Sequence, residues 1–260
     1  MPPEFMQSKV NMPDIAIILG SGQELLNSVD VSGEKPTITA YGETSSPLIR
    51  TTLGKQEVVL LARHAIDHSI PPHKINYRAN IAALQSMGIK KIIALAAVGG
   101  ITSHMSPGRL ILPDQLIDYT WGREHTFFDG DLNSLGSRVD HVDITHPYAS
   151  QLRSLFLEAS IEANIAIIDG GVYGAVQGPR LETTQEIRRM AQDGCDLVGM
   201  TGMPEAALAR EAGIEYLCCA LVANWAAGVE DGIIGMQEIR ETLSKSMQQV
   251  HTLLMEVFNQ

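Results

Sequence analysis

Runs of apolar residues alternate with amphipathic stretches along most of the chain. A near-continuous apolar run bounded by turn residues is typical of a strand in a sheet covered on both faces, and a 3.6-residue apolar period is typical of a helix. Strands are predicted at residues 15–19, 48–53, 57–62, 91–98, 109–112, 167–175, 197–200 and 216–223. Helices are predicted at residues 76–88, 148–164, 182–192, 204–212 and 236–258.

The alternation predicts an α/β fold with a central mixed or mostly parallel sheet flanked by helices. Pro204 suits the first position of its helix, because proline has no N–H to leave unpaired there. Two predicted helices carry apolar stripes that should face the sheet. The stripes are Leu152, Leu155, Phe156, Ala159 and Ala163, and Ile239, Leu243, Met247, Val250 and Leu254.

The length of 260 residues suits one domain, which we place at residues 15–260. Residues 1–14 are interpreted as an N-terminal extension, because they are rich in Met and Pro and lack the apolar core of a signal peptide. Residues 1–6 resemble a vector remnant. No apolar run approaches the ~20 residues that a membrane span needs, so we expect no membrane association.

The net charge of −11 argues against a general nucleic-acid surface, while a few fixed donors could still bind an anion locally. The three cysteines, Cys195, Cys218 and Cys219, lack the spacing of a metal site or a disulfide framework. Cys218 and Cys219 are adjacent on a predicted strand and should face opposite sides. Buried free thiols are therefore expected, in keeping with a reducing cytoplasm.

Several short segments near predicted strand ends could bind a ligand. Gly20-Ser21-Gly22 follows the first strand, where it could be an anion cradle or an ordinary strand-to-helix turn. The dinucleotide-binding fingerprint fails because Leu25 stands where a third glycine is required. Ala96 and Ala97 begin a small-residue segment that would let a ligand approach the backbone, or simply pack tightly.

Arg63 and His64 follow the strand at 57–62, at the kind of sheet edge where ligands collect. Arg63 could clamp a phosphate through its planar, permanently charged guanidinium, or it could be a surface residue beside a packed histidine. His64, His68 and His73 could suggest a metal, but no second ligand cluster with a recognisable spacing accompanies them, so no metal is expected.

Three later residues each allow a structural and a functional interpretation. Glu182 could be a first-turn acid that favours the helix dipole. Met200 could be a core residue and Thr201 a helix N-cap. The functional interpretation gains weight when all the motifs are taken together in their order along the chain. They are Gly20-Ser21-Gly22, Arg63-His64, Ala96-Ala97-Val98-Gly99-Gly100, Gly178-Pro179-Arg180-Leu181-Glu182-Thr183, Gly199-Met200-Thr201-Gly202-Met203-Pro204-Glu205 and Asn224.

Together these motifs resemble the nucleoside phosphorylases of the homotrimeric class, over nearly the whole chain from Ile15 onward. Two further segments resemble the methylthioadenosine phosphorylase branch, namely Ala62-Arg63-His64 and Ile75-Asn76-Tyr77-Arg78-Ala79-Asn80. The resemblance implies a single-domain nucleoside-phosphorylase fold. It also implies a pentosyltransferase that uses inorganic phosphate as co-substrate and needs no cofactor.

The resemblance also implies roles for individual residues. The implied phosphate-binding residues are Ser21, Arg63, His64, Ala96, Ala97 and Thr201. Met200 would lie along the ribose, and Glu182, Asn224, Trp225 and Ala226 would surround the purine. Asn224 is the expected catalytic residue, since its amide can face both O6 and N7 of a 6-oxopurine as the base leaves.

Two positions depart from the adenine-specific relatives, which carry Asp at 224 and Ser at 182. A carboxylate at Glu182 would accept the N1–H of a 6-oxopurine but would face the unprotonated N1 of adenine. At the sugar end, the apolar segment around Met236 resembles the methylthio-handling branch, whereas inosine/guanosine phosphorylases place a His there. The combination predicts S-methyl-5′-thioinosine as substrate.

Other functions remain as alternatives. The same base contacts suit an inosine/guanosine phosphorylase, and the branch resemblance leaves a methylthioadenosine phosphorylase as a weaker alternative. A non-catalytic nucleoside-binding protein is an alternative of another class. The irregular segment at 120–145 suggests a functional or interfacial loop. Within it, His141 matches a position that reaches the neighbouring subunit's sugar site, so we expect a homotrimer.

Overall fold

The computed structural model describes residues 13–20, 25–26, 32–130, 140–232 and 235–259. Within these residues ten strands form one mixed sheet, and β2 and β3 form a separate two-stranded ribbon. The strands are β1 (Ile15–Leu19), β2 (Ile38–Thr39), β3 (Gly42–Glu43), β4 (Ile49–Leu53), β5 (Gln56–Ala62), β6 (Lys91–Gly100), β7 (Leu110–Leu112), β8 (Gln115–Asp118), β9 (Ile167–Asp169), β10 (Val172–Ala175), β11 (Leu197–Gly199) and β12 (Glu215–Trp225). The helices are η2 (Pro72–Lys74), α1 (Tyr77–Ser86), α2 (Ser150–Glu162), α3 (Thr184–Gln192), α4 (Gly202–Glu211) and α5 (Met236–Asn259).

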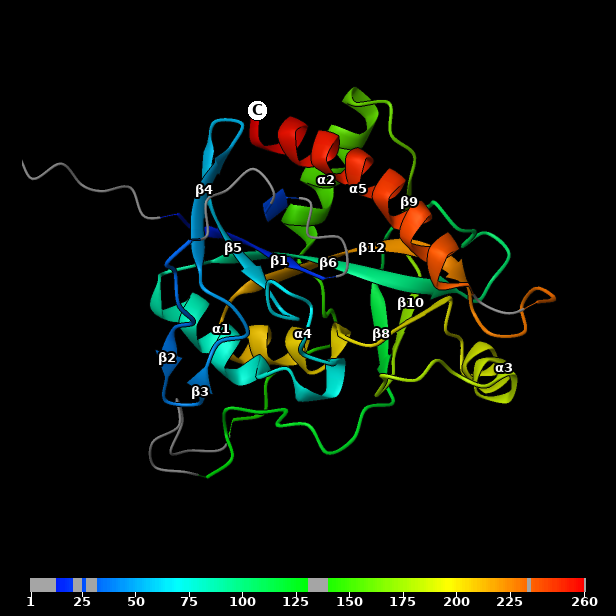
Figure 1. Cartoon of the computed structure of the whole chain (residues 1–260), viewed down its shortest axis with the longest axis horizontal. Coiled ribbons are helices and arrows are strands. Elements are labelled where there is room, and N and C mark those ends of the chain that lie inside the picture. Colours follow the sequence, from blue (N-terminus) through cyan, green and yellow to red (C-terminus); the bar gives the residue numbers. More distant parts are fainter. Residues whose placement is uncertain (1–12, 21–24, 27–31, 131–139, 233–234, 260) are drawn as a thin grey trace, which may run out of the picture.

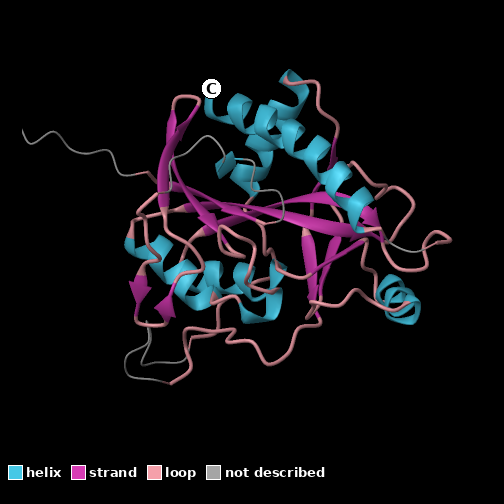
Figure 2. Cartoon of the chain, in the orientation of Figure 1, coloured by secondary structure: helices cyan, strands magenta, loops and turns pink. Residues whose placement is uncertain are grey.

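Helices cover both faces of the sheet, as the alternating pattern predicts (Figures 1 and 2). α1 and α4 pack on one face, and α2 and α5 pack on the other. The two largest buried clusters lie on opposite faces, and adjacent Cys218 and Cys219 belong one to each. All three cysteines are buried and free. None of the described helices combines the length and apolar character needed to cross a bilayer.

The core of the sheet consists of parallel pairs, with β1 between β5 and β6, and β12 beside β6. β6 continues two residues beyond the predicted 91–98, because Gly99 and Gly100 pair both with β11 and with the end of β12. A Cβ on Gly100 would lie 1.8 Å from the carbonyl oxygen of Met105, so only glycine fits this crossing.

The predicted strand at 167–175 is wrong as one element. β9 ends at Asp169 and β10 begins at Val172, and they pair with different strands, β7 and β8. Gly170 and Gly171 lie between them with φ of 119° and 117°, a conformation that side-chain-bearing residues rarely adopt. The short strand β8 and the β2–β3 ribbon have no apolar pattern that would have predicted them.

Most helix faces match the apolar stripes. On α5, Leu243, Met247, Val250 and Leu254 are buried, as predicted. On α2 the prediction for Leu155 is wrong, since 36% of this residue is exposed. Ser160 takes a place on the buried face instead. Pro204 begins the regular part of α4, because Met203 before it has extended backbone angles.

Candidate active site

A cavity of about 430 Å³ opens where several parallel strands end. Gly20 follows β1, Arg63 follows β5, and Met200 follows β11, while β6 and β12 contribute Ala97 and Asn224 from within the strands. The carboxyl ends of parallel strands are the usual ligand site of an α/β sheet, because the loops that follow them meet there. The position of the cavity therefore agrees with the motif positions.

The cavity brings together most of the residues that the motifs singled out. Its lining includes Arg63, His64, Ala96, Ala97, Glu182, Met200, Thr201, Asn224, Ala226 and Met236. Trp225 lies beside the cavity as the last residue of β12, and His141 is exposed outside it. Ser21 lies outside the described residues, although its neighbour Gly20 lines the cavity. Ile70, Pro71 and Pro72 form a wall that the motifs did not indicate.

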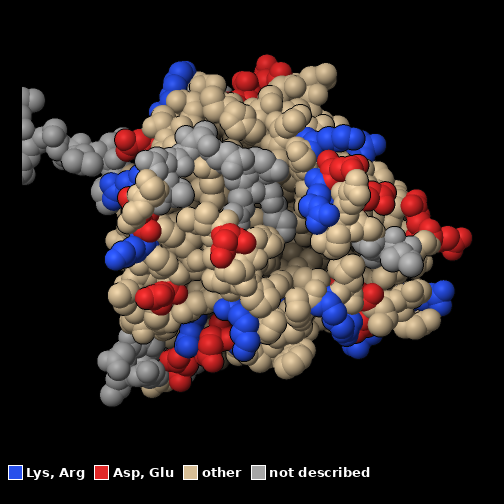
Figure 3. Space-filling model, in the orientation of Figure 1, with Lys and Arg blue, Asp and Glu red and all other residues tan. Residues whose placement is uncertain are grey.

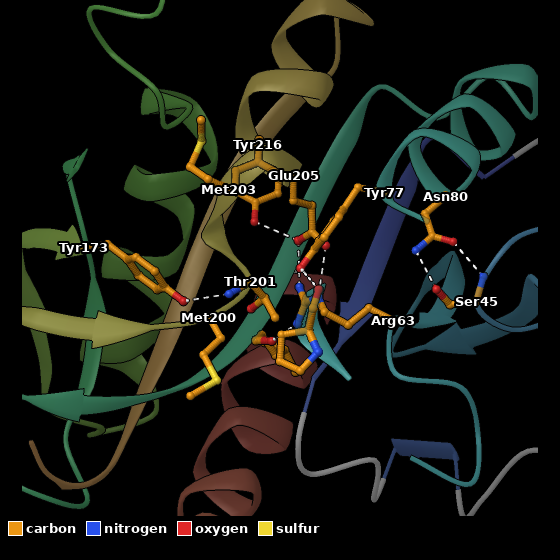
Figure 4. A network of polar contacts seen from close by, with 12 residues as sticks. Ser45, Arg63, Tyr77, Asn80, Tyr173, Met200, Thr201, Met203, Glu205 and Tyr216 are labelled. Carbon is orange, nitrogen blue, oxygen red and sulfur yellow. Dashed lines mark hydrogen bonds and ion pairs between the residues drawn. The ribbon is translucent and has the colours of Figure 1, made fainter. Parts of the chain in front are cut away.

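Arg63 is held in place by a buried ion pair with Glu205 (Figure 4). Its Nε and Nη2 donate to the two carboxylate oxygens at 3.0 and 2.7 Å, and its Nη1 donates to the carbonyl of Leu95 at 2.6 Å. Both side chains are only 1% exposed. Tyr216 adds a bond from its hydroxyl to Glu205 at 2.8 Å. Burial alone would lower the pKa of Arg63, but the Glu205 carboxylate outweighs it and the pKa is raised, so the guanidinium stays charged.

The glycine before Ser21 permits this arrangement. A Cβ on Gly20 would lie 2.7 Å from the carbonyl oxygen of Leu95 and 2.8 Å from Nη1 of Arg63. Such contacts are too short for a side chain, so Gly20 allows the guanidinium to lie against the end of β1. The interpretation of Arg63 as a surface residue is therefore wrong.

His64 is neutral at physiological pH. Burial lowers its pKa to about 4, and the adjacent charge of Arg63 contributes to the shift. Its Nδ1 lies 2.8 Å from the carbonyl oxygen of Ile70. A carbonyl can only accept, so we assign the proton to Nδ1, which leaves Nε2 as a hydrogen-bond acceptor.

Asn224 lies at an irregularity in β12. The pairing register with β6 shifts between Val222 and Asn224, which places one extra residue in β12. Such bulges re-aim side chains near active sites. Nδ2 of Asn224 donates to the carbonyl of Trp225 at 2.6 Å. One amide hydrogen and the amide oxygen therefore remain for a ligand.

Glu182 precedes α3 and does not act as its first-turn acid. Thr183 caps the helix, and Glu186 completes the capping box. Burial raises the pKa of Glu182, and the charge of Glu186 adds to the effect, while a bond from its own backbone and the charge of Arg180 oppose it. A partly desolvated carboxylate at a cavity wall would be stabilised by a donor from a ligand.

The sequence motifs assigned no individual role to Glu205 or Arg123. In the structure, Glu205 accepts two bonds from Arg63, and Arg123 donates to the carbonyl of Met200, so both support residues that line the cavity. Glu205 had a signal, since it is a charged residue on a helix face otherwise formed by Ala206, Leu208 and Ala209, all buried. Arg123 lies in the irregular segment and had none. Among the described residues no group of three or more His, Cys, Asp or Glu side chains is arranged to hold a metal ion.

Comparisons with known proteins show the family of the chain. The model of the phosphorylase superfamily matches residues 14–259. A probable S-methyl-5′-thioinosine phosphorylase of Xylella fastidiosa is 51% identical over 86% of this chain and 94% of its own. A 6-oxopurine nucleoside phosphorylase of Pyrococcus furiosus is 40% identical over 94% of this chain and 91% of its own. The structure of methylthioadenosine phosphorylase from Schistosoma mansoni in complex with adenine superposes with a TM-score of 0.86, at 30% identity over 95% of this chain and 91% of that one.

Proposed function

The chain belongs to the phosphorylase superfamily, and we propose that it cleaves S-methyl-5′-thioinosine with inorganic phosphate to hypoxanthine and 5-methylthioribose 1-phosphate. The observation that carries the proposal is that one cavity is lined by Glu182, Asn224 and the apolar residues Met236, Ile239 and Leu243. The first two suit a 6-oxopurine base, and the last three suit a methylthio group. The name and similarity of the Xylella protein support the same substrate.

At the base end, Asn224 and Glu182 offer complementary groups. The remaining amide hydrogen of Asn224 would donate to O6, and its oxygen would accept a proton gained at N7. The carboxylate of Glu182 would accept N1–H, which would also restore a partner to a desolvated group. Adenine offers neither O6 nor N1–H, so this pair favours hypoxanthine.

At the phosphate end, we propose that Arg63, Thr201 and the backbone at Ala96 and Ala97 bind the anion, together with Ser21. Because Arg63 is already paired with Glu205, only the N–H groups not used in that pair and in the bond to Leu95 remain for phosphate. Neutral His64 would accept from a P–OH group through Nε2. A hydrogen phosphate ion supplies both the acceptors and this one donor.

The reaction needs no nucleophile from the protein. A phosphate oxygen forms the new bond to C1′ as the C1′–N9 bond breaks, and the electron pair of that bond moves into the purine. The purine leaves as a neutral base when N7 takes up a proton from solvent, and the hydrogen phosphate releases its proton as the sugar phosphate forms, so the proton count balances. The protein holds the reactants in line and stabilises charge on the base, so we propose phosphate as co-substrate with no cofactor or metal.

The proposal is tested by coupled assays of base release from S-methyl-5′-thioinosine, inosine and S-methyl-5′-thioadenosine. We expect the highest kcat/KM for the first nucleoside and strict dependence on phosphate or arsenate. Fastest cleavage of inosine would assign an inosine/guanosine phosphorylase instead. Binding without base release would assign a nucleoside-binding protein.

Met236 should set a moderate preference for the methylthio group. It begins α5, lines the cavity and is 58% exposed, so this end of the pocket is apolar but partly open. An apolar pocket rejects an added hydroxyl by a factor on the order of 10² at most, so inosine should remain a slow substrate. Met236→His should narrow the ratio of kcat/KM between methylthioinosine and inosine. An unchanged ratio would remove Met236 from the sugar site.

Thr201→Ala should weaken phosphate use more than nucleoside use. The hydroxyl would donate to a charged phosphate, and hydrogen bonds to charged groups contribute about 1.5–3 kcal/mol, so the KM for phosphate should rise by roughly ten- to a hundredfold. The measurement is a phosphate titration at saturating nucleoside, with Thr252→Ala on the exposed face of α5 as control. An unchanged half-saturation for phosphate would reject the assignment. Arg63→Ala is a poorer test, because it also leaves Glu205 buried without its partner.

We propose that the protein works as a homotrimer in the cytoplasm. Leu181 lines the cavity and is 41% exposed, and Trp121 lines a neighbouring pocket that shares Glu182 and is 72% exposed, which suits a covering subunit. His141 lies outside the cavity of its own chain, as a residue serving a neighbour would. Light scattering should give three times the chain mass, and His141→Ala should lower kcat/KM without changing that mass. A fully active monomer contradicts the proposal.

The three buried free thiols suit a reducing compartment.

A further inference from the structure

Arg123 lies in the irregular segment after β8, and it is buried although it does not line the cavity. Only 8% of the residue is exposed. A buried guanidinium is costly unless its N–H groups are satisfied. The arrangement of its partners therefore indicates what the residue does.

All the hydrogen-bond partners of Arg123 among the described residues are uncharged oxygens. Its Nη2 donates to the carbonyls of Val176 and Gln177 at 3.1 and 2.9 Å, and its Nε donates to the side-chain oxygen of Gln177 at 3.1 Å. Its Nη1 donates to the carbonyls of Met200 and Met203 at 2.9 and 2.5 Å, and to the hydroxyl of Tyr77 at 3.2 Å. The guanidinium also lies 5.5 Å from the centre of the Tyr77 ring.

These partners lie behind three different walls of the cavity, and one of them, Met200, lines it directly. Val176 and Gln177 begin the segment that leads to Glu182, at the proposed base end. Met200 and Met203 flank Thr201, at the proposed ribose and phosphate end. Tyr77 continues the chain of bonds, since its hydroxyl donates to the carbonyl of Pro72, which lines the third wall.

We propose that Arg123 is a positioning residue for the cleavage reaction: it fixes the base wall and the phosphate wall of the cavity relative to each other. The proposal rests on the proposed phosphorolysis. In that reaction the phosphate oxygen must approach C1′ in line with the bond to the departing base. A displacement of about 1 Å between such groups can cost on the order of 10² in rate.

Lysine cannot replace Arg123 in this role. A guanidinium carries five N–H donors in one plane, whereas an ammonium has three donors around one atom. Lysine would preserve the positive charge but could bind only one or two of the walls at once. Arg123→Lys therefore separates the geometric role from the charge.

The matched control is Arg153 on α2. It also donates to two backbone carbonyls, those of Pro113 and Leu112 at 2.9 and 2.8 Å, and it pairs with Asp169. None of these residues lines the cavity. Arg153→Lys should thus have the local structural cost of the same replacement without affecting the two walls.

The test compares Arg123→Lys, Arg123→Met and Arg153→Lys. For both Arg123 variants we expect kcat to fall by roughly 100-fold or more. The dissociation constants of hypoxanthine alone and of phosphate alone should change by less than about threefold, because each wall keeps its own groups. Arg153→Lys should keep the kcat of the wild type, while its thermal stability should fall by about as much as that of Arg123→Lys. If Arg123→Met fails to fold, Arg123→Lys still decides.

A kcat within about threefold of the wild type in folded Arg123→Lys overturns the proposal. So does a loss of kcat matched by Arg153→Lys, since that would be a general effect of destabilisation. The assays use the nucleoside that the wild type cleaves fastest, so a wrong substrate assignment leaves this test intact. If the wild type cleaves no nucleoside, the proposed function fails. The positioning role is then tested by the dissociation constant of hypoxanthine with and without phosphate. Phosphate should change this constant in the wild type and not in Arg123→Lys. An equal change in the two proteins, or no change in either, rejects the role.

Discussion

Glu205→Ala is expected to lower the free energy of unfolding by about 3–5 kcal/mol, a large fraction of the stability of a typical domain. The substitution leaves the guanidinium of Arg63 buried at 1% exposure without its carboxylate. It also removes the acceptor for the hydroxyl of Tyr216. The loss measures the cost of an uncompensated buried charge rather than the strength of the ion pair itself.

The control is the pair of Arg180 and Glu186, which is also joined by two bonds but lies on the surface. Its two bonds are 2.8 and 2.7 Å long, but the side chains are 67% and 44% exposed. Arg180→Ala should therefore lower the midpoint of urea unfolding much less than Glu205→Ala does. Equal losses for Glu205→Ala and Arg180→Ala would show that burial does not dominate at Glu205.

The double variant Arg63→Met/Glu205→Leu separates stability from function. Replacing both charges by apolar side chains of similar size removes the unpaired group, so much of the lost stability should return. Phosphate-dependent cleavage should not return, because Arg63 is also a proposed phosphate ligand. Recovery of activity with stability would mean that the pair serves only folding.

Much of the fold followed from local pattern. The strands that end at Leu19 and Ala62 were placed correctly, because a buried parallel strand is a continuous apolar run with a sharp polar end. The same strand ends carry Gly20 and Arg63, and neighbouring parallel strands bring their ends together. The positions of the motifs at these strand ends therefore predict one shared cavity.

The contacts that organise the cavity did not follow from the sequence. Arg63 and Glu205 are 142 positions apart, and no local pattern pairs a guanidinium with a distant carboxylate. Arg123 binds backbone carbonyls, which every residue carries and which leave no mark on composition. The shift in β12 before Asn224 depends on how β6 and β12 pair, so a period of two along one strand cannot show it.

Asn224→Asp alone is expected to abolish most oxopurine cleavage without producing an efficient methylthioadenosine phosphorylase. The substitution removes the amide hydrogen that could donate to O6, because a carboxylate can only accept. It would also place a negative oxygen against the carbonyl of Trp225, which now accepts from Nδ2 at 2.6 Å. A 6-amino group could donate to the new carboxylate, so adenine binding should gain only part of what it needs.

Glu182 should limit that gain. Its carboxylate would face N1 of adenine with no proton between them, and burial already raises its pKa. A second carboxylate at 224 would share the same cavity and oppose ionisation of both groups. Glu182→Ser removes the repulsion, so adenine cleavage should recover only in the double variant, and the effects should be strongly non-additive.

The measurement is kcat/KM for S-methyl-5′-thioinosine and S-methyl-5′-thioadenosine in both single variants and the double variant. Glu158→Ser on the exposed side of α2 serves as the control for removing a carboxylate outside the cavity. A site that hydrogen-bonds its substrate can discriminate by roughly 10⁴–10⁵, so the ratio of the two constants should move over several orders of magnitude in the double variant. Additive effects, or a complete switch from Asn224→Asp alone, would show that Glu182 does not contact the base. The carboxylate of Glu182 and the amide of Asn224 would bind neighbouring groups of one purine. The preference for hypoxanthine over adenine should therefore reverse only when both residues are replaced.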